Sequence, residues 1–277
     1  MITGRTKLIA HVGYPTESFK APMIYNPWFE KQGIDAVVVP MGVRDVDYVA
    51  ALAAIRRFTN IHGALVTMPH KVSTVELLDE PSTAVKIAGA CNALLFKPDG
   101  KLAGDNFDGA GFVRGVMRKG LVLAGSSCLV VGTGGVGSAI AASLAAQGPA
   151  SMTLFDTNTA AAERLAARLR EHYPRIAVRV GSSDPAGYTL VVNGTPLGMK
   201  AGDPLPFDVS RLAPDTFVGE VVMKQEITPL LRAAIDRGCP YQVGTDMLFE
   251  MIPAYLEFFG FGTATPDQLR AVATIAY

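Results

Sequence analysis

Lysine, asparagine and aspartate side chains stand near the ends of apolar runs, where they can take part in chemistry. Lys71 closes the stretch 67–71, Asn92 follows a small-residue run, and Asp108 lies in the stretch 104–109. In open α/β sheets ligands bind at the carboxyl ends of strands. An amine and a carboxylate that meet there can move or hold the proton of an alcohol. By position alone, Lys71 equally suits a surface lysine at a helix start, and Asp108 an ordinary helix cap.

A glycine-rich stretch has the spacing of a dinucleotide-binding loop. Gly132, Gly134 and Gly137 follow the order G-x-G-x-x-G between a strand expected at 128–131 and a helix expected at 138–147. Gly132 permits the tight turn, Gly134 lets backbone approach a pyrophosphate, and Gly137 lets the helix pack closely on the strand. The phosphates would sit at the helix N-terminus, where free N–H groups and the helix dipole favour negative charge.

The next expected strand, at 152–155, ends in an aspartate. Asp156 follows Gly137 by about 20 residues, the distance at which a ribose-binding acid is found. A carboxylate there hydrogen-bonds the ribose 2′-OH and repels a 2′-phosphate, which predicts NAD as the cofactor, with NADP as the alternative. Asp156 also suits a residue that only ends the strand or caps the next helix.

The composition is that of a soluble globular protein. The chain has 277 residues, of which 49% are hydrophobic and 18% charged, and its net charge is zero. This balance gives no indication of binding to nucleic acid or to an anionic membrane. The three cysteines and four histidines lack metal-ligand spacing, and an odd cysteine count argues against a disulfide framework. No apolar run suits a signal peptide or a membrane span, so we expect a cytoplasmic protein without a metal.

Strands and helices are expected to alternate before the glycine motif. Strands are predicted at 8–12, 37–39 and 63–67, and helices at 21–31 and from Asp45, as the cap, to about Phe58. The second helix would bury Val49, Leu52, Ala53 and Ile55. This order is typical of a parallel sheet with crossover helices. A hairpin at 92–96 and 101–104 should follow, about the turn 98–100.

A second alternation surrounds the glycine motif. A helix at 109–119 should precede it, and Asn158 or Thr159 should cap a helix that buries Ala162, Leu165, Ala166 and Leu169. Further strands are expected at 176–180, 190–193, 217–223 and 241–243. Further helices are expected at 229–237, at 246–259 with a kink at Pro253, and after a capping box at Thr265.

Several stretches of the chain resemble the shikimate/quinate dehydrogenase family. They read VTMPHK (66–71), GACNA (89–93), GDNFDGAGF (104–112), VVGTGGVGSA (130–139), NGTPLGM (193–199), EITPLL (226–231) and GTDMLFE (244–250), in the order of the family. The resemblance implies an α/β fold with two domains. Residues 1–106, completed by the C-terminal helices of 245–277, would form a substrate domain, and residues 107–244 a Rossmann domain that binds NAD(P).

The resemblance also implies a reaction and the residues that carry it. The reaction is reversible hydride transfer between NAD(P) and a ring hydroxyl of shikimate or quinate, as in the shikimate pathway of aromatic amino acid biosynthesis. Lys71 would take the hydroxyl proton while Asp108 holds that hydroxyl, or Lys71 would act as a charged donor to the developing alkoxide. Thr67 and Asn92 match substrate contacts. The matched cofactor contacts are Gly132, Thr133, Gly134, Gly135, Val136, Gly137, Asn193, Thr195, Val221 and Gly244.

The chain departs from the family at substrate-binding positions. Phe19 and Ala21 stand where the family has two serines that bind the substrate carboxylate, and Met223 and Met251 replace a tyrosine and a glutamine. Hydrogen bonds to a charged group are worth about 1.5–3 kcal/mol each, so losing two weakens shikimate binding roughly a hundredfold. We therefore expect a less polar or modified relative of shikimate or quinate. Candidate substitute anchors are Ser18, Lys20 and Tyr25.

Two other functions fit the same residues. The chain could be a sensor that binds a ligand or cofactor on this scaffold without useful turnover, although a sensor does not need both Lys71 and Asp108. It could also reduce a different ring ketone, such as an aminated analogue. In each case we expect a small cyclic hydroxy acid or its analogue as the partner, and a monomer or a homodimer.

Overall fold

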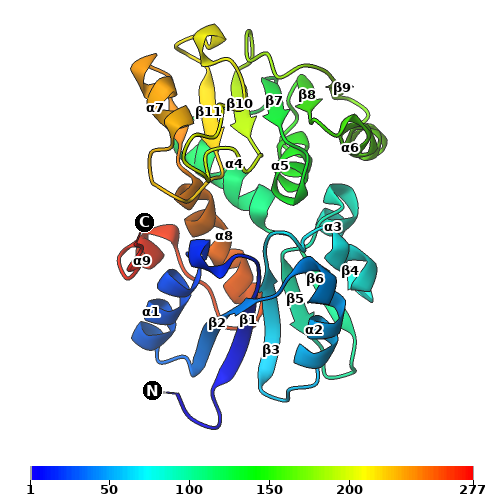
Figure 1. The fold of residues 1–277 in the computed structure, drawn as a ribbon, viewed down its shortest axis with the longest axis vertical. Coiled ribbons are helices and arrows are strands. Elements are labelled where there is room, and N and C mark those ends of the chain that lie inside the picture. Colours follow the sequence, from blue (N-terminus) through cyan, green and yellow to red (C-terminus); the bar gives the residue numbers. More distant parts are fainter. Residues whose placement is uncertain (1, 277) are drawn as a thin grey trace. The chain divides into compact units, whose positions relative to one another are not determined.

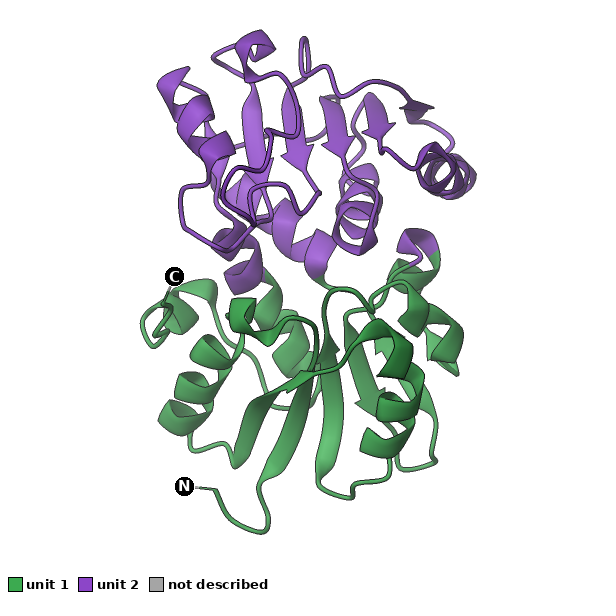
Figure 2. Ribbon diagram, viewed as in Figure 1, with its two compact units in different colours: residues 1–86, 90–107, 251–276 green, residues 87–89, 108–250, 277 purple. Residues whose placement is uncertain are grey.

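The computed structural model describes residues 2–276, and their contacts divide the chain into two compact units (Figure 2). Unit 1 comprises the described residues up to 86, residues 90–107 and residues 251–276, and unit 2 comprises residues 87–89 and 108–250. The second boundary therefore falls after Glu250 rather than after Gly244. Ion pairs explain the difference, because Asp246 lies 3.0 Å from Lys119 Nζ and Glu250 lies 3.2 Å from Arg118, both within unit 2.

Unit 1 is built on a six-stranded mixed sheet with the order β2-β1-β3-β5-β6-β4 (Figure 1). Its strands are β1 (Lys7–Gly13), β2 (Ala36–Gly42), β3 (Ile61–Val66), β4 (Glu80–Pro81), β5 (Ala93–Phe96) and β6 (Leu102–Asp105). The first three are parallel neighbours, and β5 and β6 form the predicted hairpin. The strand β4 is missing from the sequence prediction, because two residues show no periodicity.

Helices cover both faces of the unit 1 sheet. On one face α2 (Tyr48–Ile55) packs Tyr48, Leu52 and Ile55 against alternate residues of β1 and β3. The prediction for this helix was partly wrong. Asp45 lies in a 3-10 turn before the helix and does not cap it, and Val49 and Ala53 are exposed because the buried stripe begins at Tyr48.

The other face of this sheet is covered by α1 (Pro22–Gln32) and by residues 251–258 of α8 (Gly244–Phe258), which continues through Pro253. Tyr25 of α1 makes an edge contact with Tyr255 of α8, with ring centroids 6.4 Å apart. A Cβ atom on Gly63 of β3 would lie 2.7 Å from Phe259. The remaining helices of this part are α3 (Thr83–Ala88), which continues into unit 2, and α9 (Pro266–Arg270), which has the predicted capping box at Thr265.

Unit 2 is a doubly wound sheet of six parallel strands with the order β12-β11-β10-β7-β8-β9. The strands are β7 (Ser127–Val131), β8 (Ser151–Phe155), β9 (Ala177–Val180), β10 (Leu190–Asn193), β11 (Phe217–Glu220) and β12 (Tyr241–Gln242). Read from β7, this is the strand order of a Rossmann fold, which confirms the predicted fold class. The strand β11 ends at Glu220 and not at Met223, because the next two N–H groups donate to the Glu220 carboxylate.

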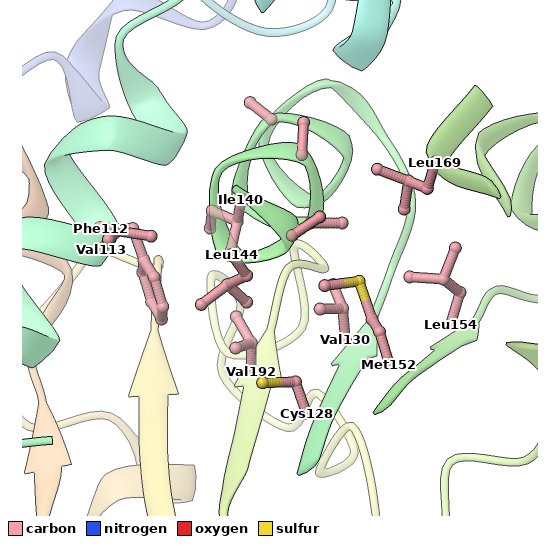
Figure 3. Close-up of a cluster of buried hydrophobic side chains, with 14 of the residues drawn as sticks. Phe112, Val113, Cys128, Val130, Ile140, Leu144, Met152, Leu154, Leu169 and Val192 are labelled. Carbon is pink, nitrogen blue, oxygen red and sulfur yellow. The ribbon is translucent and has the colours of Figure 1, made fainter. Parts of the chain in front are cut away.

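Four helices pack on the unit 2 sheet. One face is covered by α4 (Asp108–Arg118), α5 (Gly135–Ala145) and α6 (Thr159–His172), and the other by α7 (Pro229–Asp236). Figure 3 shows the core on the face that α4, α5 and α6 cover, in which Ile140 and Leu144 of α5 pack with Cys128 and Val130 of β7. The helix α5 begins before the predicted residue 138, because Gly134 is its N-cap and the glycines that follow are helical. Asn158 caps α6, whose four predicted apolar residues are buried.

Among residues 2–276, no helix is long and apolar enough to cross a membrane. Within that same range, no group of three or more His, Cys, Asp or Glu residues is placed to hold a metal ion. The three cysteines are free and buried.

Candidate functional site

The loop after β3 brings Lys71 and Asn92 together in unit 1. The Lys71 carbonyl accepts a hydrogen bond from the N–H of Cys91, and the Lys71 side chain is only 8% exposed. Asn92 is 1% exposed, and its Oδ1 accepts from the N–H of Phe107 at 3.0 Å. Asp108 follows Phe107 directly in the chain, is buried, and is the first residue of α4. Asn92 thus links the segments that carry the two predicted catalytic residues.

One donor of Asn92 is buried without a partner. Its Nδ2 makes no hydrogen bond, whereas its backbone carbonyl accepts from Val66 N–H at 2.8 Å and from the Tyr255 hydroxyl at 3.1 Å. Leaving a buried donor unsatisfied costs about 1–3 kcal/mol. A hydroxyl or carbonyl oxygen of a bound ligand would remove that cost, so this amide is a candidate binding group. Thr67 is half-buried nearby in the sheet and donates its N–H to Val12.

The analysis of the sequence missed His11, which lies on β1 in register with Leu65 of β3. Its ring stacks on Phe19 with centroids 4.1 Å apart, and its Nδ1 is buried without a partner. Burial, and then the charge of Lys71, lower the pKa of His11 from 6.5 to about 3, so the imidazole is neutral at physiological pH. The available signal was strand alternation, which places His11 on the face opposite Ala10 and Val12.

This burial predicts an acid-sensitive fold. An unfolded chain binds a proton on His11 below pH 6.5, whereas the folded protein does not until about pH 3, so acidification favours unfolding over that range. The contribution from His11 is expected to be at most about 1.4 kcal/mol per pH unit. Urea denaturation of the wild type and His11→Leu at neutral and mildly acidic pH measures it. The variant should lose this component, and His172→Leu, at an exposed histidine, should keep it. Equal acid sensitivity of the wild type and His11→Leu would contradict the prediction.

Phe19 and Ala21, which stand at the positions of the two serines of the family, are apolar and buried. Phe19 is 9% and Ala21 6% exposed, and the Phe19 ring reaches to 3.0 Å from the Cβ position of Gly13. Met251 is half-buried in the part of α8 that belongs to unit 1. Phe107 packs against Tyr255, with centroids 4.8 Å apart. Phe19, which stacks on His11, and Ala21 therefore offer no polar side-chain atoms at these two positions.

The three candidate substitute anchors differ in their surroundings. Lys20 is buried and its Nζ donates to the carbonyl of Ala276. Ser18 donates its hydroxyl to the carbonyl of Pro15 at 3.4 Å. The hydroxyl of Tyr25 is buried without a partner. Of the three, Tyr25 has the hydrogen-bonding capacity that a ligand could use.

In unit 2 the three glycines have separate geometric roles. Gly132 has φ +93°, and a Cβ there would lie 2.7 Å from Thr195 Cγ2. A Cβ on Gly137 would lie 1.9 Å from the carbonyl oxygen of Gly132. A Cβ on Gly134 would meet nothing within 4 Å. Gly132 and Gly137 therefore shape the turn and its packing on the helix, whereas Gly134 leaves open space at the N-terminus of α5, which fits a pyrophosphate. Gly135 and Val136, in the first turn of α5, are half-buried.

Asp156 is held against the glycine loop. Its Oδ2 accepts from Thr133 N–H at 2.6 Å and from the Thr133 hydroxyl at 2.9 Å, and its Oδ1 accepts from Asn158 N–H at 2.8 Å. Burial raises the pKa of Asp156, but hydrogen bonds from Thr133, Asn158 and Thr157 outweigh it and hold the pKa below its usual value. An ionised carboxylate therefore stands at the end of β8, beside the loop that suits the cofactor phosphates.

Glu220, which the sequence did not point to, is hydrogen-bonded to Asn193, and Asn193 is hydrogen-bonded to Thr195. The Asn193 amide donates to Glu220 Oε1 at 2.9 Å, and its Oδ1 accepts from Thr195 N–H at 3.0 Å. Glu220 also accepts from Val221, Val222 and Thr228; burial raises its pKa and these donors oppose the shift. The Asn193 side chain, fully buried, thus shapes the loop after β10.

Three further residues predicted to contact the cofactor or the substrate lie after β11. Val221 and Met223 are half-buried and pack against the core of unit 2. A Cβ on Gly244 would lie 2.5 Å from the carbonyl oxygen of Val222, so only glycine permits this approach. The backbone around Gly244 and the backbone after β11 therefore lie in direct contact within unit 2.

Comparison with known proteins identifies the family. A family model described as "Shikimate dehydrogenase substrate binding domain" matches residues 12–94. The chain is 35% identical over 276 residues to the shikimate dehydrogenase (NADP(+)) of Acidiphilium cryptum, covering 99% of this chain and 98% of the relative. This chain belongs to the shikimate dehydrogenase family. A further member, the shikimate dehydrogenase (NADP(+)) of Rhodospirillum rubrum, is 33% identical over 279 residues, covering 98% of each chain.

Solved structures of relatives have the same fold as this chain over nearly its whole length. Shikimate 5-dehydrogenase from Listeria monocytogenes, in complex with shikimate and NAD, is 27% identical with a TM-score of 0.86, covering 98% of this chain and 97% of that one. Quinate dehydrogenase from Corynebacterium glutamicum, in complex with NAD, is 29% identical with a TM-score of 0.82, covering 96% and 98%. A nicotinamide dinucleotide cofactor is thus confirmed as a class, with NADP(+) in the names of the curated relatives and NAD in these complexes.

Proposed function

We propose that this chain is an NAD(P)-dependent oxidoreductase that transfers hydride reversibly between the cofactor and a ring hydroxyl of a shikimate- or quinate-type cyclic compound. Unit 1 would bind the substrate and unit 2 the cofactor. The observation that carries the proposal is the buried Lys71, whose carbonyl accepts from Cys91 N–H, together with the adjoining Asn92, whose Nδ2 is buried without a partner. The open space beside Gly134 supports the cofactor assignment.

Each residue of the site has its own role in the proposed reaction. The glycine loop and Asp156 would hold a nicotinamide dinucleotide, which would supply the acceptor for the hydride of the carbinol carbon. Neutral Lys71 takes up the hydroxyl proton during oxidation, its ammonium form returns that proton during reduction, and Asp108 accepts a hydrogen bond from the same hydroxyl. Asn92 donates from Nδ2 to a neighbouring substrate oxygen. Glu220 holds Asn193 and Thr195 in place. The cytoplasmic location and the monomeric or homodimeric state stay predictions.

Steady-state reduction of NAD+ and NADP+ with shikimate, quinate and related cyclic alcohols tests this function. We expect turnover of at least one of them, followed by the absorbance of the reduced nicotinamide. Cofactor binding without turnover of any cyclic alcohol would contradict the proposal and favour a ligand-sensing protein.

We also propose that NAD is preferred over NADP. The support is the ionised Asp156 at the end of β8, since a carboxylate there hydrogen-bonds a ribose hydroxyl and repels a 2′-phosphate. Asp156→Ala is expected to lower the ratio of kcat/KM for NAD to that for NADP by about tenfold or more. Asp208→Ala, at an exposed aspartate, should leave the ratio unchanged. A wild-type preference for NADP would defeat this proposal.

A further inference from the structure

The surroundings of His11 bear on which substrate unit 1 accepts. We infer that His11 is a specificity-determining residue and that it recognises an uncharged oxygen group of the substrate, a hydroxyl or a carbonyl, where the region has no built site for a carboxylate. The inference rests on the proposed function, because it names the substrate class for the same site.

The first step is the location of His11. It lies near the carboxyl end of β1, and the neighbouring strand β3 leads into Thr67 and Lys71. After burial, the charge of Lys71 contributes to the lowered pKa of His11. Thr67 donates its N–H to Val12, the residue after His11. Because ligands bind at the carboxyl ends of such strands, His11 lies toward the edge of the sheet at which the proposed function places Lys71.

The second step is the hydrogen-bonding capacity of His11. Its ring is 7% exposed, and Nδ1 is buried without a partner, a loss that a ligand atom would repair. A neutral imidazole has one donor and one acceptor nitrogen and carries no charge. It therefore suits a hydroxyl or a carbonyl and offers no ion pair to a carboxylate. The stacked Phe19 ring fixes its orientation.

The third step is the charge balance around the ring. Phe19 and Ala21 have no polar side-chain atoms, and Lys20 is buried with its Nζ donating to the carbonyl of Ala276. The other cation, Lys71, acts on His11, and the proposed function assigns it to the reacting hydroxyl. Removing a carboxylate from water without paired or hydrogen-bonding groups is costly. Two further unpartnered groups of unit 1, Asn92 Nδ2 and the Tyr25 hydroxyl, suit neutral oxygens as well. Together these groups favour an uncharged polyhydroxy ring or its ketone.

Matched substrates test the inference. Shikimate is compared with its methyl ester and with the primary alcohol that replaces its carboxylate. The wild type is expected to show a kcat/KM for a neutral analogue that is about tenfold or more above that for the acid. The double variant Phe19→Ser/Ala21→Ser should shift the acid-to-ester ratio roughly a hundredfold toward the acid, since two hydrogen bonds to a charged group are gained.

Variants of His11 separate recognition from folding. His11→Leu should raise KM for the neutral analogues about tenfold while kcat changes little, and His11→Asn, which keeps a polar atom near the Nδ1 position, should restore most of the KM. NADH affinity, which depends on unit 2, and thermal melting check that each variant is folded.

The outcomes distinguish this inference from the proposed function. A wild type that turns over the acid better than both neutral analogues, or an unchanged KM in His11→Leu, would overturn the inference and leave the proposed function standing. Absence of turnover with every compound would overturn the proposed function. Calorimetric binding of acid and ester still decides the inference in that case, because tighter binding of the acid contradicts it and tighter binding of the ester supports it.

Discussion

Lys71→Ala is expected to lower kcat by about 10²–10⁴-fold, the range over which a positioned acid or base contributes. The Lys71 side chain is buried next to Asn92, so water does not readily replace the lost amine. The affinity for NADH should stay within about twofold, because the glycine loop and Asp156 belong to unit 2. Stopped-flow or steady-state turnover and fluorescence titration with NADH give the two quantities.

Lys86→Ala is the matched control for this substitution, because Lys86 is an exposed lysine on α3. It should retain wild-type kcat. Two results would count against a catalytic Lys71. One is a kcat that falls by less than about threefold, and the other is a loss of NADH affinity as large as the loss of turnover.

Gly134→Ala and Gly137→Ala are expected to separate cofactor binding from stability. A Cβ on Gly137 would lie 1.9 Å from the carbonyl oxygen of Gly132, so the backbone of the loop or the helix α5 must move. Overpacking of this kind costs about 1–3 kcal/mol or more. We expect a clear fall in the melting temperature of Gly137→Ala and at least about a tenfold weaker affinity for NADH.

The Gly134 variant should behave differently. Its Cβ would meet nothing within 4 Å and its φ is −67°, so the melting temperature should stay close to that of the wild type. The same methyl group occupies the space where backbone approaches a pyrophosphate, so NADH affinity should fall by about tenfold or more. Thermal melting and NADH titration of both variants test this. Equal melting temperatures, or an unchanged affinity in Gly134→Ala, would show that the loop does not hold the phosphates in this way.

Local patterns were sufficient to predict much of the fold. The segment from β7 to Asp156 is continuous in the chain. Its strand, turn, helix and second strand are therefore determined by neighbouring residues such as Gly132 and Gly137. The apolar period of α6 likewise predicted its four buried residues. Where a local signal was ambiguous, prediction failed. Asp45 resembles a helix cap, but the chain first makes a 3-10 turn and the buried face begins at Tyr48.

The amino-acid sequence alone was enough to predict most helices and strands, the α/β fold class, the glycine loop with its acid, and the resemblance to the family. The surroundings of the site residues became known from the three-dimensional structure. The stack of His11 on Phe19, the unpartnered amide of Asn92, and the hold of Glu220 on Asn193 all depend on partners from other elements. Periodicity and capping act over a few residues and set secondary structure, whereas strand order and register determine which distant side chains meet, and no local pattern records them.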